Sequence, residues 1–265
     1  MKLKINNVRI SLLHEQSLEQ AVCKKAGISR EMLDGVQILR KAVDARKKQD
    51  VCLNYHVLAD IEANGRQAKR LLADRDISKY EQKAAPELVL GTLPLSAPPV
   101  VIGAGPAGLL AALQLAEHGY QPLLLERGKP VAERVQDVQR FWSSGEFNPV
   151  SNVQFGEGGA GTFSDGKLNT SVKDPSGRNR LVLETFVRFG ADESILYDNK
   201  PHIGTDVLSE VIVNMRKFLV DKGATFVFDT CVSNLDIVSQ RLLSVYTDSE
   251  SNNKEIKTDI CVLAP

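Results

Sequence analysis

The chain has 265 residues, of which 43% are hydrophobic and 25% are charged. This composition excludes a disordered or fibrous protein and allows one large domain or two smaller ones. The formal net charge is zero, but residues 1–90 hold 17 Lys and Arg against 12 Asp and Glu, so the first part is basic and the remainder acidic. We therefore expect a domain boundary near residue 90. Because the basic excess is small and dispersed, it argues against nucleic acid as a partner.

The cysteines and the apolar stretches exclude several classes of site. The four cysteines form no close pair, and none stands with a histidine at the spacing of metal ligands. Neither a disulfide framework nor a metal site is predicted. No segment has the apolar core of a signal peptide or the roughly 18 uninterrupted apolar residues of a membrane helix. We therefore expect a cytoplasmic protein with no membrane partner.

The first residues predict a strand followed by a helix. Apolar residues alternate with polar ones over residues 3–10, as in a strand with one buried face. Ser17 and Gln20 then form a capping-box pattern, which starts a helix that should end at Gly27.

Further elements complete a small, basic α+β domain over residues 1–90. Ser29 is expected to cap a second helix, and residues 51–58 alternate as a strand would. Charged residues across 62–83 predict one more exposed helix. The apolar face of the second helix would hold Met32, Val36 and Leu39. Regular helix is excluded from the following connector by Pro86, Pro94, Pro98 and Pro99.

From Pro99 onward the pattern is that of an α/β domain, which we place at residues 91–265. Two helices are predicted, one over 180–189 closed by Gly190 and one capped by Thr205 or Asp206 and closed by Gly223. The later strands are predicted at residues 225–228, near 242–247 and at 260–265.

The strongest motif begins at a short apolar strand, Val100–Ile102. It leads directly into Gly103-Ala104-Gly105-Pro106-Ala107-Gly108, a G-x-G-x-x-G pattern. A dinucleotide-binding pattern of this kind must follow a strand and open a helix, as this one is predicted to do. Gly103 permits a tight turn, Gly105 lets the backbone approach a pyrophosphate, and Gly108 lets the next helix lie against the strand. The free amides at the start of that helix would bind the anion, and Pro106 and Ala107 are expected to contact the cofactor there.

A second apolar strand ends at Glu126, where a carboxylate accepts hydrogen bonds from ribose hydroxyls. Strand, turn, helix, strand and acid together predict a dinucleotide site, and the alternative is a degenerate Rossmann unit that has lost its ligand. The Arg127 and Gly128 that follow resemble FAD-binding members of the glutathione-reductase superfamily more than NAD dehydrogenases. FAD is therefore the predicted cofactor.

A second glycine-rich stretch covers residues 152–168 and is too rich in glycine to be a regular element. Residues 161–167 also match the core of a nucleotide P-loop. However, Leu168 stands where the magnesium-binding Ser or Thr belongs, and no buried strand leads into the loop. A flexible surface loop is the remaining structural alternative.

We expect this stretch to pass along the flavin, with its backbone amides facing the pyrophosphate or the ring. A cation or an amide near the flavin would stabilise the negative charge that develops on reduction. The expected contacts come from Gly158, Gly159, Ala160, Gly161, Thr162, Ser164 and Lys167.

Three segments together resemble a known family. They are residues 141–149, the stretch NVQFGEGGAGTFSDGKL at 152–168, and Lys200-Pro201-His202-Ile203-Gly204-Thr205-Asp206. The chain resembles the FAD-dependent dehydrogenase-like proteins called NAD(FAD)-utilising dehydrogenases, over its whole length. The resemblance implies a glutathione-reductase-type FAD-binding fold and an oxidoreductase activity whose reaction is undefined.

The same resemblance bears on the end of the chain. Proteins of this kind continue well past the position of Pro265, and in related flavoproteins the last strand is followed by a glycine turn that returns to the flavin. We therefore expect the N-terminal part of a longer protein, with an FAD-binding domain incomplete at its C-terminus and the remainder of that protein as a partner. Superfamily topology further implies that Val232 contacts the adenine through its backbone.

His202 is the best candidate for a general acid among the four histidines, because it stands in a loop bounded by Pro and Gly and close in sequence to the cation Lys200. Together these two residues would suit an anionic group on a small-molecule substrate. An ordinary loop histidine is the alternative. The lack of a neighbouring cysteine pair argues against disulfide-reductase chemistry.

The predicted function is that of an FAD-dependent oxidoreductase that moves hydride equivalents between the flavin and a small organic molecule, with NAD(P)H as an unproven reductant. Two alternatives stay open. One is a non-catalytic FAD-binding or RNA-associated module, and the other is an FAD enzyme of tRNA modification.

Overall fold

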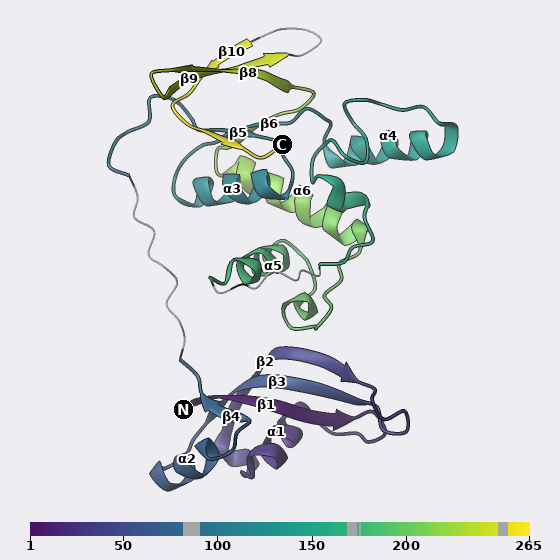
Figure 1. The fold of residues 1–265 in the computed structure, drawn as a ribbon, viewed down its shortest axis with the longest axis vertical. Helices are drawn as coiled ribbons and strands as arrows, with labels where there is room; N and C mark the ends of the chain where they lie inside the picture. The colour runs from purple at the N-terminus through teal and green to yellow at the C-terminus, as the bar shows by residue number, and fades with distance from the viewer. Residues whose placement is uncertain (82–90, 169–173, 175, 249–253) are drawn as a thin grey trace. The chain divides into compact units, whose positions relative to one another are not determined.

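The computed structural model describes residues 1–81, 91–168, 174, 176–248 and 254–265, and it divides the chain into two compact units (Figure 1). The first unit comprises residues 1–89 and 193–201, and the second comprises residues 90–192 and 202–265. Of the predicted connector, Pro86 lies outside the described residues.

The first unit is an antiparallel sheet with two helices. Its elements are β1 (Lys2–Ser11), α1 (Leu18–Ala26), a 3-10 turn η1 (Arg30–Met32), β2 (Leu33–Asp44), β3 (Cys52–Ile61), α2 (Gly65–Leu72) and β4 (Ile77–Lys79). The strand order is β2-β3-β1-β4, and each neighbouring pair is antiparallel. This is the β-α-β-β-α-β arrangement of a split βαβ, or ferredoxin-like, unit.

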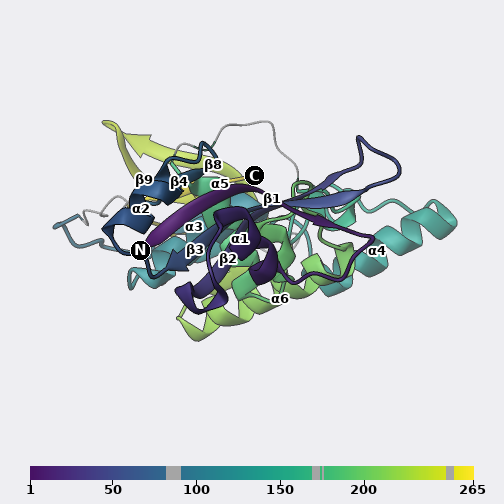
Figure 2. The same cartoon turned by 90° about the horizontal axis from the view of Figure 1, so that it is seen from below.

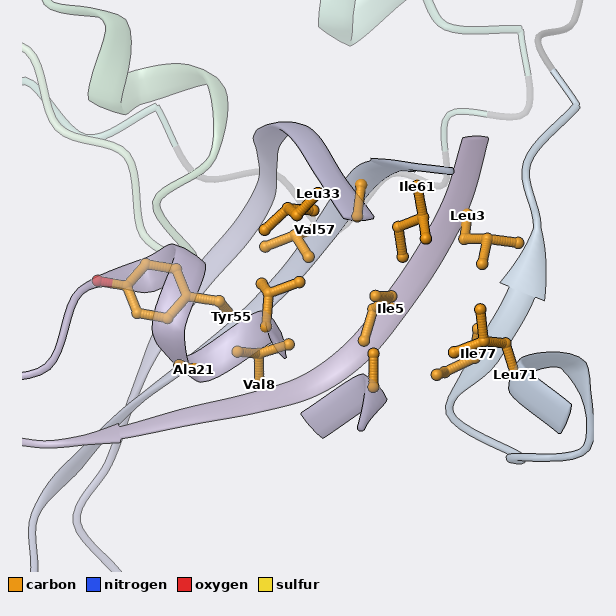
Figure 3. Close-up of a cluster of buried hydrophobic side chains, with 13 residues drawn as sticks. Leu3, Ile5, Val8, Ala21, Leu33, Tyr55, Val57, Ile61, Leu71 and Ile77 are labelled. Atoms are coloured by element: carbon orange, nitrogen blue, oxygen red, sulfur yellow. The ribbon is translucent and has the colours of Figure 1, made fainter. Parts of the chain in front are cut away.

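The alternation of the strands produces the core of this unit. Leu3, Ile5 and Val8 of β1 are fully buried, and they pack with Val57 and Ile61 of β3 (Figure 3). Ala21, Val22 and Ala26 of α1 belong to the same cluster. Viewed from the helical side, α1 lies in front of these strands (Figure 2).

The structure confirms the first helix and corrects the second. Ser17 and Gln20 form the capping box of α1, and Gly27 closes it in the left-handed conformation, with a φ of 63°. Residues 30–32 form only one 3-10 turn, and β2 follows instead of the predicted helix. Pairing along nearly the whole of β3 determines this conformation, since tertiary contacts override local propensity.

The first unit includes a short segment, residues 193–201, that was predicted to belong to the second domain. Lys41 in β2 donates its backbone N–H to Tyr197 O at 2.7 Å and accepts from Asn199 N at 2.8 Å. Lys41 Nζ also lies 3.4 Å from a carboxylate oxygen of Asp198. Residues 193–201, which contain the 3-10 turn η3 (Glu193–Leu196), therefore cover the outer edge of this sheet.

The second unit contains a parallel sheet. Its elements are β5 (Val100–Ile102), α3 (Pro106–Glu117), β6 (Leu123–Leu125), α4 (Val131–Ser144), η2 (Ala160–Phe163), α5 (Arg178–Arg188), α6 (Thr205–Asp221), β7 (Thr225–Val227), β8 (Cys231–Val238), β9 (Arg241–Asp248), β10 (Lys254–Lys257) and β11 (Cys261–Leu263). The order β11-β5-β6-β7 is entirely parallel. This is the predicted Rossmann-like α/β fold.

Two layers enclose that sheet. Helices α3 and α6 lie on one side, and the antiparallel sheet β10-β9-β8 lies on the other (Figure 1). Val245 of β9 is fully buried against Val100 and Leu125. The near-continuous apolar runs of β5 and β6 follow from this burial on both faces.

One predicted cap in this unit is wrong. Gly204 is the N-cap of α6, in an extended conformation and without a side-chain cap hydrogen bond, so neither Thr205 nor Asp206 is the capping residue. Both lie inside the first turn, where the charge of Asp206 complements the helix dipole. In the part of the chain that the structure describes, no helix is long and apolar enough to span a membrane.

Candidate functional site

A cavity of about 480 Å³ lies at the carboxyl ends of β5 and β6, beside the N-terminus of α3. Ligands of open parallel sheets bind at this edge, and the volume lies within the range of small-molecule sites. The predicted cofactor residues that line it are Gly103, Gly105, Pro106, Ala107, Glu126, Arg127, Gly159, Ala160 and Val232. Cys231, Ala264 and Pro265 also line it.

The first glycine turn requires its glycines for different reasons. Gly103 has a φ of 101° and donates its N–H to Leu125 O at 2.8 Å, which joins the turn to β6. A Cβ on Gly108 would overlap the carbonyl oxygen of Gly103. Close approach of α3 to β5 therefore depends on Gly108, in the role predicted for it.

The N-terminus of α3 faces the cavity with its backbone. Gly105 is the N-cap and has no side chain to cap the helix, and Pro106 occupies the first helical position. Pro106 has no N–H, so the next amides of the first turn are the donors available to a ligand. An N-terminus of this kind favours an anion.

Glu126 is 5% exposed, and both of its carboxylate oxygens bind backbone amides. Oε2 accepts from Ala104 N at 2.7 Å, and Oε1 accepts from Gly128 N at 2.9 Å. A carboxylate has about four acceptor positions, so a ribose hydroxyl can still bind. The ribose contact stays a prediction. The hydrogen bonds by which Glu126 holds the amides of Ala104 and Gly128 were not predicted.

Arg127 presents an unpaired donor. Its guanidinium lies 3.9 Å from the centre of the Phe155 ring, a cation–π contact between two residues of the cavity wall. Its Nε is buried and has no hydrogen-bond partner among the residues that the structure describes. Buried donors are nearly always satisfied, which points to a ligand as the missing acceptor.

The second glycine stretch packs directly against the first. Gly158 N donates to Ala104 O at 2.9 Å, and a Cβ on Gly159 would lie 3.0 Å from Pro106 Cδ. A Cβ on Gly128 would lie 2.6 Å from Gly156 Cα. The two stretches therefore form one continuous wall, which explains why both are rich in glycine.

Arg134 of α4, which was not predicted as a site residue, is fully buried beneath this loop. Its guanidinium donates to five backbone carbonyls and one hydroxyl: those of Asn152, Val153, Gly156, Glu157, Gly159 and Thr162. One feature of the sequence does indicate that Arg134 is buried. Arg134 stands three residues after Val131 and four before Val138, both buried, so it occupies the apolar face of the helix.

Glu157 is also fully buried in this layer. Its Oε2 accepts from Val131 N at 2.8 Å, and its Oε1 lies 2.8 Å from Arg216 Nε, an ion pair whose atoms are not aligned as a hydrogen bond. Burial raises the pKa of the Glu157 carboxyl, and the Val131 amide and Arg216 oppose that rise.

Several predicted flavin contacts lie outside the cavity lining. The Thr162 hydroxyl donates to Gly159 O at 2.8 Å, and the Ser164 hydroxyl donates to Gly161 O at 2.9 Å, so both stabilise the loop itself. Lys167 is exposed and pairs with Asp165 at 2.7 Å. Gly158 is buried against Ile212. Flavin contacts by these residues stay predictions.

The structure places His202 beside the end of the second loop. His202 and Lys167 form an isolated antiparallel bridge, and Ile203 N donates to Gly166 O at 2.8 Å. His202 Nε2 lies 2.7 Å from Asp165 O. Lys200 is exposed and belongs to the first unit, whereas His202 belongs to the second.

No metal-binding cluster of His, Cys, Asp or Glu occurs among the residues described. The parallel sheet and the cavity at its first glycine turn define a Rossmann-type dinucleotide-binding domain. Residues 99–162 match the family described as an FAD binding domain, and residues 2–60 match a domain of unknown function, DUF8436. The predicted FAD-binding domain and the separate small domain before it are confirmed.

One curated relative is an uncharacterised protein of Clostridium beijerinckii (strain ATCC 51743 / NCIMB 8052). It is 39% identical over 268 residues, which cover 100% of this chain and 48% of that protein. The chain thus spans about half the length of this relative.

Two solved structures show weak likenesses. THI4 of Thermovibrio ammonificans is 18% identical with a TM-score of 0.39, over 63% of this chain and 56% of that one. The 3-ketosteroid-delta4-(5alpha)-dehydrogenase of Rhodococcus jostii RHA1 is 14% identical with a TM-score of 0.38, over 62% of this chain and 44% of that one. Neither adds to the family match.

Proposed function

We propose that this chain binds FAD in the cavity between the two glycine stretches and forms part of an FAD-dependent oxidoreductase acting on a small organic molecule. The observation that carries the proposal is the buried, unpaired Nε of Arg127 in the wall of a cavity built on an FAD-type fingerprint. A dinucleotide supplies the acceptor that this donor lacks.

The residues present fit that cofactor. The amides at the start of α3 would hold the pyrophosphate, because the helix dipole and the missing side-chain cap both leave them available. Gly103 and Gly105 leave room for its approach, and Glu126 has acceptor capacity left for a ribose. When bound, FAD supplies the acceptor and donor of hydride equivalents.

His202 is the proposed proton donor toward the substrate. Its Nε2 lies 2.7 Å from Asp165 O, and since a carbonyl oxygen only accepts, Nε2 must carry a proton in the neutral ring. Nδ1 is then the ring nitrogen left to contact the substrate.

The absorption spectrum of the purified protein tests the proposal. We expect a flavin band after incubation with FAD and its bleaching by dithionite without oxygen. Addition of NADH or NADPH then asks whether a nicotinamide is the reductant. A protein that stays colourless and has no affinity for FAD would refute FAD binding, and a bound flavin that no organic reductant bleaches would favour a non-catalytic FAD-binding module.

A further inference from the structure

We propose that Arg134 is a positioning residue of the cofactor site. By fixing the carbonyl groups of the second glycine stretch, it gives that stretch the shape of a cavity wall. The inference rests on the proposed FAD site and adds a residue that touches neither the cavity nor the cofactor.

The hydrogen bonds use the whole guanidinium. Nε donates to Asn152 O at 2.8 Å and Nη2 donates to Val153 O at 2.8 Å. Nη1 donates to Glu157 O and Gly159 O, each at 2.8 Å, and it lies 3.3 Å from Gly156 O and Thr162 Oγ1. One side chain thus connects both ends of an eight-residue segment that has no regular secondary structure.

The loop is built around this particular side chain. Gly156 has a φ of 122°, and a Cβ there would overlap Arg134 Cδ. The aliphatic stem therefore passes where only glycine leaves room. A lysine could not replace this arginine, because a single ammonium group cannot reproduce the planar fork that binds carbonyls in several directions.

The charge of Arg134 is balanced locally. Burial lowers the pKa of its guanidinium to about 10, while the negative charges of Glu126 and Glu157 oppose that effect. The side chain therefore remains a cation at neutral pH. Charged donors make stronger hydrogen bonds than neutral ones, which suits a group that must hold several carbonyls at once.

The positioned residues are those that form the wall. Phe155, Gly156 and Gly159 line the cavity, and each is either held by Arg134 or adjacent to a residue that it holds. Phe155 also carries the cation–π contact with Arg127. Loss of the Arg134 bonds would therefore displace the wall and the Arg127 donor together.

The test compares Arg134→Lys and Arg134→Met with Arg140→Met, which removes an arginine from the exposed side of the same helix. FAD titration measures the dissociation constant, and hydrogen exchange of the apo chain reports on residues 152–162. We expect both Arg134 variants to bind FAD at least tenfold more weakly and to exchange faster over 152–162, with α3 and α6 unchanged. Arg140→Met should match the wild type in both measurements.

Exchange unchanged over residues 152–162, or wild-type FAD affinity in Arg134→Lys, would overturn the inference. So would loss of the folded state in both Arg134 variants, because Arg134 would then be a general folding residue. If the wild type itself does not bind FAD, the proposed function fails, and the exchange measurement alone still decides whether Arg134 positions the loop.

Discussion

Gly108→Ala tests whether close packing of α3 on β5 holds the first glycine turn together. The added Cβ would lie 1.9 Å from Gly103 O, whereas ordinary contact begins at 3.4 Å. The helix would therefore have to move by about 1.5 Å, against backbone atoms that cannot rotate away. The backbone conformation of Gly108 is accessible to alanine, so strain in φ does not contribute.

The expected magnitude combines two effects. Overpacking costs roughly 1–3 kcal/mol, and we expect about 3 because the obstacle is backbone. Alanine in a helix returns about 1 kcal/mol, so the free energy of unfolding should fall by about 2 kcal/mol. In a unit of this size the melting temperature should fall by about 4–8 °C.

Urea unfolding, followed by circular dichroism, measures this change. Gly105→Ala is the matched control, since its Cβ would lie 4.0 Å from Gly159 Cα, an ordinary contact. That variant should retain wild-type stability and lose FAD affinity, because Gly105 lines the cavity. The reasoning is refuted if Gly108→Ala unfolds within about 0.5 kcal/mol of the wild type.

Three further predictions follow from other parts of the chain. Glu126→Gln should lower the free energy of unfolding by about 2 kcal/mol, because an amide has one oxygen for the two N–H donors of Ala104 and Gly128; urea unfolding of the apo chain measures this, and an unchanged value would contradict it. Asp76→Asn removes an ion pair in which Lys25 Nζ lies 2.6 Å from the Asp76 carboxylate. The hydrogen bond from Lys25 holds the pKa of Asp76 below its usual value. The free energy of unfolding should therefore fall by about 1 kcal/mol at pH 7. The pKa of Asp76 is depressed in the folded state, so that difference should shrink below about pH 4 and vanish once Asp76 is protonated; a difference that persists in acid would show another cause. Cys231 lines the cavity, so bound FAD should slow the alkylation of its thiol several-fold and leave the alkylation of Cys23, in the first unit, unchanged. Peptide mass spectrometry measures both rates. Equal rates at Cys231 with and without FAD would place the cofactor elsewhere.

The elements that the sequence predicts well are those determined by near neighbours. The capping box at Ser17 and the left-handed Gly27 lie within one helix, and both occur as predicted. The prediction of a second helix is wrong because it rested on the helical spacing of Met32, Val36 and Leu39, whereas this segment forms a strand that pairs along β3. Val36 and Ile38 are β-branched and partly buried on that sheet, and cross-strand packing outweighs a three-residue coincidence of spacing.

The candidate site likewise has one part that is determined by near neighbours in the sequence and one part that depends on a distant residue. The turn from Gly103 to Gly108 is local, so its geometry follows from a motif. The second glycine stretch depends on Arg134, which lies 18 residues before the first carbonyl that it binds, and no local pattern relates the two. An arginine on the buried face of an amphipathic helix nevertheless requires buried acceptors, and a nearby loop rich in glycine offers backbone carbonyls without side chains in the way. Combining these two features would have predicted the pairing before the structure, because each supplies what the other lacks.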